Sequence, residues 1–162
     1  MKNLKGLQVL VTGAASGIGL ECARAFAQRG ANLVISDVNA TALENARAGI
    51  AATGVQCFAR TCDVASEESV AGFARVVHEA VGPIDVLVNN AGVAFLGSFE
   101  QTPLSEWRRI YDINVLGIVH CIRAFLPAMR AASRLRRIVN VASLAGFAPA
   151  PNMSAYAASK HA

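Results

Sequence analysis

The 162-residue sequence predicts an α/β fold built on a doubly wound parallel sheet. Short apolar runs alternate with helix-like segments, and such runs are typical of strands that are buried on both faces of a parallel sheet. The runs also end in polar residues, which are Thr12, Asp37, Asp63, Asn89 and Ser143. Because ligands bind beyond the carboxyl ends of parallel strands, we expect this edge of the sheet to be functional.

The first strand is expected over residues 7–12, followed by a glycine-rich loop over 12–19 and a helix over 20–28. In the loop, glycines let the backbone approach a ligand, and the helix N-terminus offers free N–H groups to a pyrophosphate. The loop has the spacing G-x-x-x-G-x-G, with Gly13, Gly17 and Gly19. It is longer than the standard dinucleotide-binding loop.

The second strand is expected over residues 31–36 and ends at Asp37. A carboxylate at this point can accept hydrogen bonds from the ribose hydroxyls of adenosine, and it repels the 2′-phosphate of NADP. No Arg or Lys occupies residues 38–40 or the glycine loop, so the sequence favours NAD over NADP. In the alternative interpretation, Asp37 is a turn residue or a cap of the next helix.

The remaining elements repeat the alternation. We expect strands over 55–62, 84–88 and 137–142, and helices over 41–52, after the N-cap Ser66, and after Thr102 and Pro103. Thr102 would be the N-cap of that helix, and Pro103 its first residue. Five strands in the order 3-2-1-4-5 would form a Rossmann-like sheet.

Tyr156 and Lys160 are the strongest candidates for catalysis. If a helix starts at residue 154, the two side chains lie one turn apart on one face, about 6 Å along the axis. An ammonium group beside a phenol favours the phenolate, so the tyrosine can exchange a proton with an alcohol or ketone. As a short motif, the pair is also compatible with an exposed Tyr–Lys contact that has no function.

Together these residues resemble the short-chain dehydrogenase/reductase family over the whole chain. Residues 12–19 are similar to its T-G-x-x-x-G-I-G cofactor loop, and residues 89–92 are similar to its N-N-A-G motif. Asp63 and Val64 are similar to the pair that lies against the adenine. The positions of the family's catalytic tetrad are occupied by Asn114, Ser143, Tyr156 and Lys160.

The resemblance implies an oxidoreductase that transfers a hydride between NAD(H) and an alcohol or ketone. Tyr156 would be the general acid/base, Lys160 would lower its pKa and hold the nicotinamide ribose, and Ser143 would orient the substrate oxygen. Asn114 would position a water in a proton relay. The implied cofactor-binding residues are Thr12, Gly13, Ser16, Gly17, Ile18, Gly19, Asp37, Asp63, Val64, Asn89, Ala91, Gly92, Tyr156 and Lys160. Outside this context, Ser143 reads as a strand-end cap and Asn114 as a helix-terminus residue.

Composition favours a single cytoplasmic domain over residues 1–162. Hydrophobic residues make up 54% of the chain, and no secretory or membrane-spanning run is evident.

The cysteines form no C-x-x-C pair and are expected to be small apolar residues; they are Cys22, Cys57, Cys62 and Cys121. We expect no metal site. A basic cluster of Arg130, Arg134, Arg136 and Arg137 is expected to be a solvated connection rather than a nucleic-acid surface.

The sequence stops two residues after Lys160, inside the helix that would carry the catalytic pair. We therefore expect either the N-terminal portion of a longer enzyme or a truncated chain, with residues 138–142 as an exposed apolar edge. The full-length protein would be a homo-oligomer, by resemblance to the family. Two other classes stay open, an NAD-binding module without catalysis and an interaction protein that dimerises through the helices after Asn114 and through the open edge of the sheet. Apolar residues in 93–101 and 144–153 favour a largely apolar substrate.

Overall fold

The sheet has five parallel strands in the order β3-β2-β1-β4-β5. The computed structural model describes residues 4–132, 136–148 and 151–162. The strands are β1 (Gln8–Thr12), β2 (Asn32–Asp37), β3 (Cys57–Thr61), β4 (Val86–Asn89) and β5 (Arg137–Asn140). The predicted fold class and strand order are confirmed, although every strand differs from its predicted range by one or two residues at one end or both.

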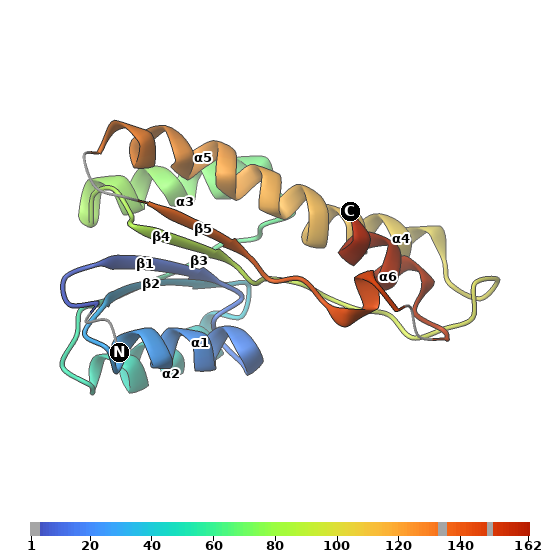
Figure 1. Cartoon of the computed structure of the whole chain (residues 1–162), viewed down its shortest axis with the longest axis horizontal. Helices are drawn as coiled ribbons and strands as arrows, with labels where there is room; N and C mark the ends of the chain where they lie inside the picture. Colours follow the sequence, from blue (N-terminus) through green and yellow to red (C-terminus); the bar gives the residue numbers. More distant parts are fainter. Residues whose placement is uncertain (1–3, 133–135, 149–150) are drawn as a thin grey trace.

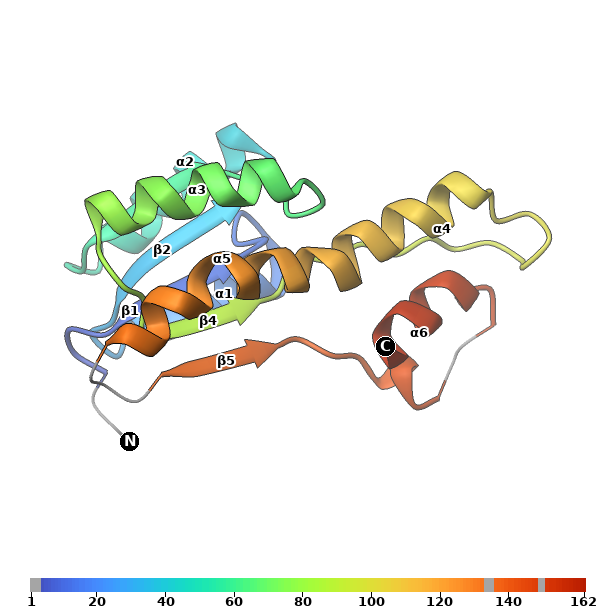
Figure 2. The same cartoon turned by 90° about the horizontal axis from the view of Figure 1, so that it is seen from above.

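Helices cover both faces of the sheet (Figure 1). One face carries α1 (Gly17–Ala27) and α2 (Ala40–Ala51), and the other carries α3 (Glu67–Ala80) and α5 (Gly117–Ala131). The helices α4 (Leu104–Tyr111) and α6 (Ser154–His161) lie beyond the carboxyl ends of the strands (Figure 2). α1 begins at Gly17, three residues before its predicted start, so two loop glycines belong to its first turn.

Two apolar cores, one on each face, explain why the strands are apolar without alternation. Val9 and Val11 of β1 lie in the core beneath α1 and α2, whereas Leu10 lies in the core beneath α3 and α5. Successive side chains of a strand point to opposite faces, so a strand with a core on each side needs apolar residues at every position. β5 differs, because it lies at the sheet edge and leaves Ile138 and Val139 partly exposed.

The parallel register brings the ends of the strands to one edge. Thr12 of β1 pairs with Ser36 of β2, and Asn89 of β4 pairs with Asn140 of β5. Asp37 lies at the same edge because it pairs with Thr61 of β3. The polar strand ends predicted from the sequence therefore gather in space.

The capping predictions have mixed outcomes. The hydroxyl of Ser66 accepts a hydrogen bond from the Ser69 N–H at 3.1 Å, which confirms it as the N-cap of α3. The prediction for Thr102 and Pro103 is wrong by one residue, since α4 has Pro103 as its N-cap. The Thr102 hydroxyl instead donates to the Ser98 carbonyl at 2.7 Å, so it is engaged in the preceding turn.

A single long helix runs from Leu104 to Ala131. Between α4 and α5 it contains a π-helical segment, η1 (Asp112–Leu116), so Asn114 lies inside a helix and its interpretation as a terminus residue is wrong. By length and composition alone, this 28-residue helix could cross a membrane. In the fold, α5 places Cys121, Phe125 and Met129 in the core against the sheet, which accounts for much of its apolar character.

Arg136 corrects the interpretation of the basic cluster. Its side chain is only 13% exposed and forms an ion pair with the buried Asp85, which also accepts a hydrogen bond from the Gln8 N–H at 2.8 Å. A guanidinium group buried in this way needs a carboxylate partner, and Arg136 is therefore not part of a solvated surface. Arg134 lies outside the described residues.

The cysteines offer a test of this packing. Burial raises the pKa of the Cys57 thiol to about 11 and that of the Cys121 thiol to about 12, and all four cysteines are free. The thiolate is the reactive form, so raising the pKa lowers the reactive fraction at pH 8. We expect iodoacetamide to label Cys57 and Cys121 at least about 100-fold more slowly in the folded chain than in urea. The labelling rate should rise about tenfold per pH unit and level off only above these pKa values, which peptide mass spectrometry would measure. Rapid labelling of folded Cys121 at pH 8 would contradict its burial.

Candidate active site

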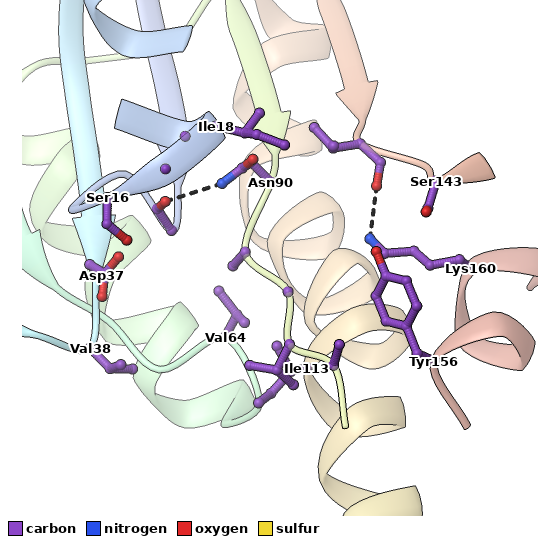
Figure 3. Close-up of a pocket in the computed structure, with 18 of the residues that line it drawn as sticks. Ser16, Ile18, Asp37, Val38, Val64, Asn90, Ile113, Ser143, Tyr156 and Lys160 are labelled. Atoms are coloured by element: carbon purple, nitrogen blue, oxygen red, sulfur yellow. Dashed lines mark hydrogen bonds between the residues drawn. The ribbon is translucent and has the colours of Figure 1, made fainter. Parts of the chain in front are cut away.

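A cavity of about 580 Å³ lies at the carboxyl edge of the sheet. Figure 3 shows side chains from the glycine loop, the end of β2, the segment after β4 and α6 directed toward it. Of the predicted site residues, it brings together Gly13, Ser16, Gly17, Ile18, Gly19, Asp37, Asp63, Val64, Ala91, Gly92, Ser143, Tyr156 and Lys160. Three others, Thr12, Asn89 and Asn114, are buried behind its wall.

The glycine loop is shaped by close backbone contacts. Gly13 and Gly17 have φ angles of +63° and +53°, a region that favours glycine. A Cβ atom on Gly19 would lie 2.2 Å from the Gly13 carbonyl oxygen and 2.4 Å from Nδ2 of Asn90. Only a hydrogen fits there. The N-cap Ser16 makes no side-chain cap, so the first N–H groups of α1 are available to an anion.

Asn90 holds this loop against the end of β4. Its Nδ2 donates to the Thr12 carbonyl at 3.0 Å and to the Gly13 carbonyl at 3.1 Å. Asn90 was not among the predicted site residues, although it lies inside the N-N-A-G segment. The residue that was predicted there, Asn89, points elsewhere and donates from Nδ2 to Oδ1 of Asn140 at 2.9 Å.

Thr12 supports the cavity from beneath rather than lining it. Its hydroxyl oxygen accepts hydrogen bonds from the N–H groups of Asn90 and Ala91, both at 3.1 Å, and donates to the Val88 carbonyl at 3.5 Å. The side chain thus joins the end of β1 to the end of β4. The structure gives Thr12 and Asn89 a supporting position in place of the contact that the resemblance implies.

Asp37 both holds the turn after β2 and lines the cavity. Its carboxylate accepts from the Ala15 N–H at 3.1 Å and from the Asn39 N–H at 3.0 Å, so it does organise the turn after β2. The cap of α2 is Asn39 and not Asp37, because the Asn39 side chain accepts from the Ala42 N–H. Asp37 also lines the cavity, and a carboxylate has further lone pairs for a ligand.

Ser143 likewise serves as a cap and lines the cavity. It is the N-cap of a short 3₁₀ helix, η2 (Leu144–Gly146), and its hydroxyl oxygen accepts from the Ala145 N–H at 3.2 Å. This hydrogen bond uses a lone pair of the hydroxyl oxygen and leaves the O–H free to donate. Among the residues that the structure describes, no acceptor for that O–H is found.

Tyr156 and Lys160 lie on one side of α6 and both line the cavity (Figure 3). Lys160 Nζ is 5.9 Å from the centre of the Tyr156 ring and donates to the Val141 carbonyl at 2.9 Å. That carbonyl follows β5, so the strand end fixes where the ammonium sits. The alternative of a pair directed into solvent is wrong.

Asn114 is committed to protein contacts. It is 2% exposed, its Oδ1 accepts from the Val93 N–H at 2.9 Å, and its Nδ2 donates to the Val93 carbonyl at 2.9 Å. The second N–H of Nδ2 donates to the Ser159 hydroxyl at 2.9 Å. The side chain therefore braces the cavity wall at Val93 against η1.

Charge in the cavity is divided between its two ends. The Asp37 carboxylate and the Lys160 ammonium lie at opposite ends (Figure 3), and Asp63 follows β3, the strand that pairs with β2 at Asp37. Within the described part of the chain, no three His, Cys, Asp or Glu side chains lie together as metal ligands. The cavity therefore fits an elongated ligand that carries an anionic group and hydroxyl groups. The anionic group would lie at the glycine loop, where free N–H groups are available, and the hydroxyl groups would lie near the carboxylates, which can accept their hydrogen bonds.

Comparison with known proteins identifies the family. The sequence model for short chain dehydrogenases matches residues 8–162. The chain belongs to the short-chain dehydrogenase family. It is 42% identical to a probable oxidoreductase, EphD, of Mycobacterium tuberculosis over 154 residues, which are 95% of this chain and 26% of that protein.

Solved structures of the family agree with this assignment. An NAD+-bound xylitol dehydrogenase has a TM-score of 0.94 and 39% identity, over 99% of this chain and 62% of that one. A metagenomic short-chain oxidoreductase in complex with NADP has a TM-score of 0.91 and 38% identity, over 98% of this chain and 72% of that one. Family members thus bind either dinucleotide.

Gly19 provides a test of the glycine loop. In Gly19→Ala, the added methyl would clash with backbone and with Asn90, so we expect a loss of about 1–3 kcal/mol of stability and at least about tenfold weaker dinucleotide binding. The matched control is Gly72→Ala in α3, where nothing lies within 4 Å of the added Cβ. That variant should gain about 0.5–1 kcal/mol, because alanine is the better helix former. Thermal unfolding and calorimetry would measure both effects, and unchanged binding in Gly19→Ala would contradict the close approach.

Proposed function

We propose that the protein is an oxidoreductase that transfers a hydride between NAD(H) and an alcohol or ketone. The observation that carries the proposal is that Ser143, Tyr156 and Lys160 line the same cavity as the glycine loop. A dinucleotide bound along this cavity would extend from the loop and Asp37 toward α6. The glycine loop supports this placement of the dinucleotide. At Gly13 and Gly19, neighbouring backbone atoms lie so close that a side chain would not fit.

The proposed preference for NAD rests on Asp37. Its carboxylate lines the cavity beside the glycine loop and would accept hydrogen bonds from the adenosine ribose. A 2′-phosphate would be repelled there. Among the described residues that line the cavity, the one cation is Lys160, at the opposite end, and the neighbouring Val38 offers no charge to a phosphate.

In the proposed mechanism, Ser143 donates its O–H to the substrate oxygen and fixes its position. During alcohol oxidation, the alcohol proton passes to the Tyr156 phenolate; during ketone reduction, the Tyr156 O–H returns a proton to the substrate oxygen. The ammonium of Lys160 stabilises the phenolate electrostatically. When bound, the nicotinamide supplies or accepts the hydride. The lining of the cavity also includes Val93, Ala94 and Ile113, which supports a largely apolar substrate.

We also propose a homo-oligomer as the form of the full protein. Support comes from the apolar side chains of Leu104, Leu116 and Val119, which are exposed on the long helix. Exposed apolar residues along one helix are typical of a surface that another chain covers.

Replacing Tyr156 tests the acid/base assignment. Tyr156→Phe removes the hydroxyl and keeps the ring, so we expect alcohol-dependent NAD reduction to fall by at least about 10²–10⁴-fold while NAD affinity changes little. The assay should use the complete polypeptide that carries this sequence and a panel of secondary alcohols. The matched control is Tyr111→Phe at the end of α4, since Tyr111 does not line the cavity. Full activity in Tyr156→Phe would reject the proposed role, and NAD binding without turnover in the parent would favour a binding module.

Replacing Asp37 tests the cofactor preference. Asp37→Ala should weaken NAD by about 1.5–3 kcal/mol, the value of hydrogen bonds to a charged group, and should weaken NADP much less because it also removes repulsion. Asp37→Asn is the matched variant, because it keeps one acceptor oxygen and removes the charge. Calorimetric titration with both dinucleotides would measure the ratio of affinities. An unchanged ratio in both variants would show that Asp37 does not contact the ribose.

A further inference from the structure

Three consecutive residues attach α6 to three separate segments. Ser159 bonds to Asn114 in η1, Lys160 bonds to Val141 after β5, and the His161 ring is 2.8 Å from the Gly146 carbonyl in η2. Successive residues of a helix point in directions about 100° apart, so these contacts hold α6 from three sides. An eight-residue helix is not stable on its own, and its orientation therefore depends on such contacts.

Ser159 has a distinctive place among the three. The residue is 4% exposed and does not line the cavity. Its hydroxyl donates to the carbonyl of Tyr156 at 2.7 Å and accepts from Nδ2 of Asn114 at 2.9 Å. A hydroxyl group can donate and accept through one atom, which neither alanine nor a larger apolar residue can do.

The Asn114 amide extends this contact to the opposite wall of the cavity. It binds both backbone groups of Val93, which lines the cavity. The neighbouring Gly92 is packed so closely that a Cβ there would lie 3.2 Å from Oδ1 of Asn114 and 3.6 Å from Nζ of Lys160. The backbone of Tyr156 is thus joined through Ser159 and Asn114 to the segment that follows β4.

We propose that Ser159 is a positioning residue for Tyr156 and Lys160, and this inference rests on the proposed dehydrogenase function. Its hydroxyl sets the orientation of α6 against η1, so that the phenol and the ammonium both face the cavity. Ser159 touches neither the cavity nor the reacting atoms, and it acts only through the backbone of Tyr156 and through Asn114. Removing the hydroxyl leaves one buried N–H of Asn114 without its acceptor and lets α6 shift.

The test compares Ser159 variants in the complete polypeptide that carries this sequence. Ser159→Ala should lower kcat by at least about tenfold while KM for NAD rises by a smaller factor, because the glycine loop and Asp37, which would hold the other end of the dinucleotide, are untouched. Ser159→Thr keeps the hydroxyl and should recover most of kcat. The control Ser154→Ala removes a hydroxyl from the first residue of the same helix and should behave as the parent protein.

A purely structural role predicts a different pattern. In that case Ser159→Ala would lower the unfolding temperature but keep the parent kcat when it is assayed well below that temperature, and this result would overturn the proposal. A folded Ser159→Thr variant as slow as Ser159→Ala would do the same.

If the alanine variant does not fold, Ser159→Cys, which is close in size but a weak hydrogen-bond partner, takes its place with the same expected loss of kcat. Tyr156→Phe is assayed in parallel, because full activity in that variant rejects the dehydrogenase mechanism itself rather than the role of Ser159.

Discussion

The structure depends on the parallel pairing of β1 with β2 on one side and β4 on the other. β1 is buried on both faces, so its backbone groups have to be satisfied by the two neighbouring strands. This pairing fixes where the three strands end relative to one another. The glycine loop after β1, the turn at Asp37 and the segment after β4 are consequently brought around one space, which is the cavity.

Most polar residues around the cavity form hydrogen bonds within the protein, whatever role they have in the proposed reaction. Thr12 and Asn90 join the end of β1 to the end of β4, Asp37 accepts from two backbone N–H groups, and Ser143 caps η2. These bonds restrict the side chains and the backbone before any ligand is present. A site whose donors and acceptors are held in this way does not have to reorganise when a ligand binds.

The two halves of the site differ in how firmly they are built. The half at the glycine loop is formed by that loop and by strand ends that belong to the buried sheet, so its geometry follows from the main core. The half with Tyr156 and Lys160 stands on the short helix α6, which lies beyond the sheet and is held by side-chain contacts. Besides the burial of the small residues Ala155 and Ala157, its geometry therefore depends on single hydrogen bonds, each contributing on the order of 1 kcal/mol.

The sequence by itself determined the elements and the edge at which they meet. Apolar runs and glycines are local signals, and together with the resemblance to the short-chain dehydrogenases they were sufficient for the fold class, the strand order and most residues that line the cavity. Only the tertiary structure decided which way the polar side chains point. Asn89 and Asn90 are adjacent and chemically identical, yet Asn89 bonds to Asn140 of β5 and Asn90 holds the glycine loop. Likewise Arg136 is buried against Asp85, Thr12 lies beneath the cavity, and Asn114 reaches Ser159 across 45 positions of sequence. The physical reason is that a side chain's partner is set by packing between segments far apart in the chain, which no local pattern encodes.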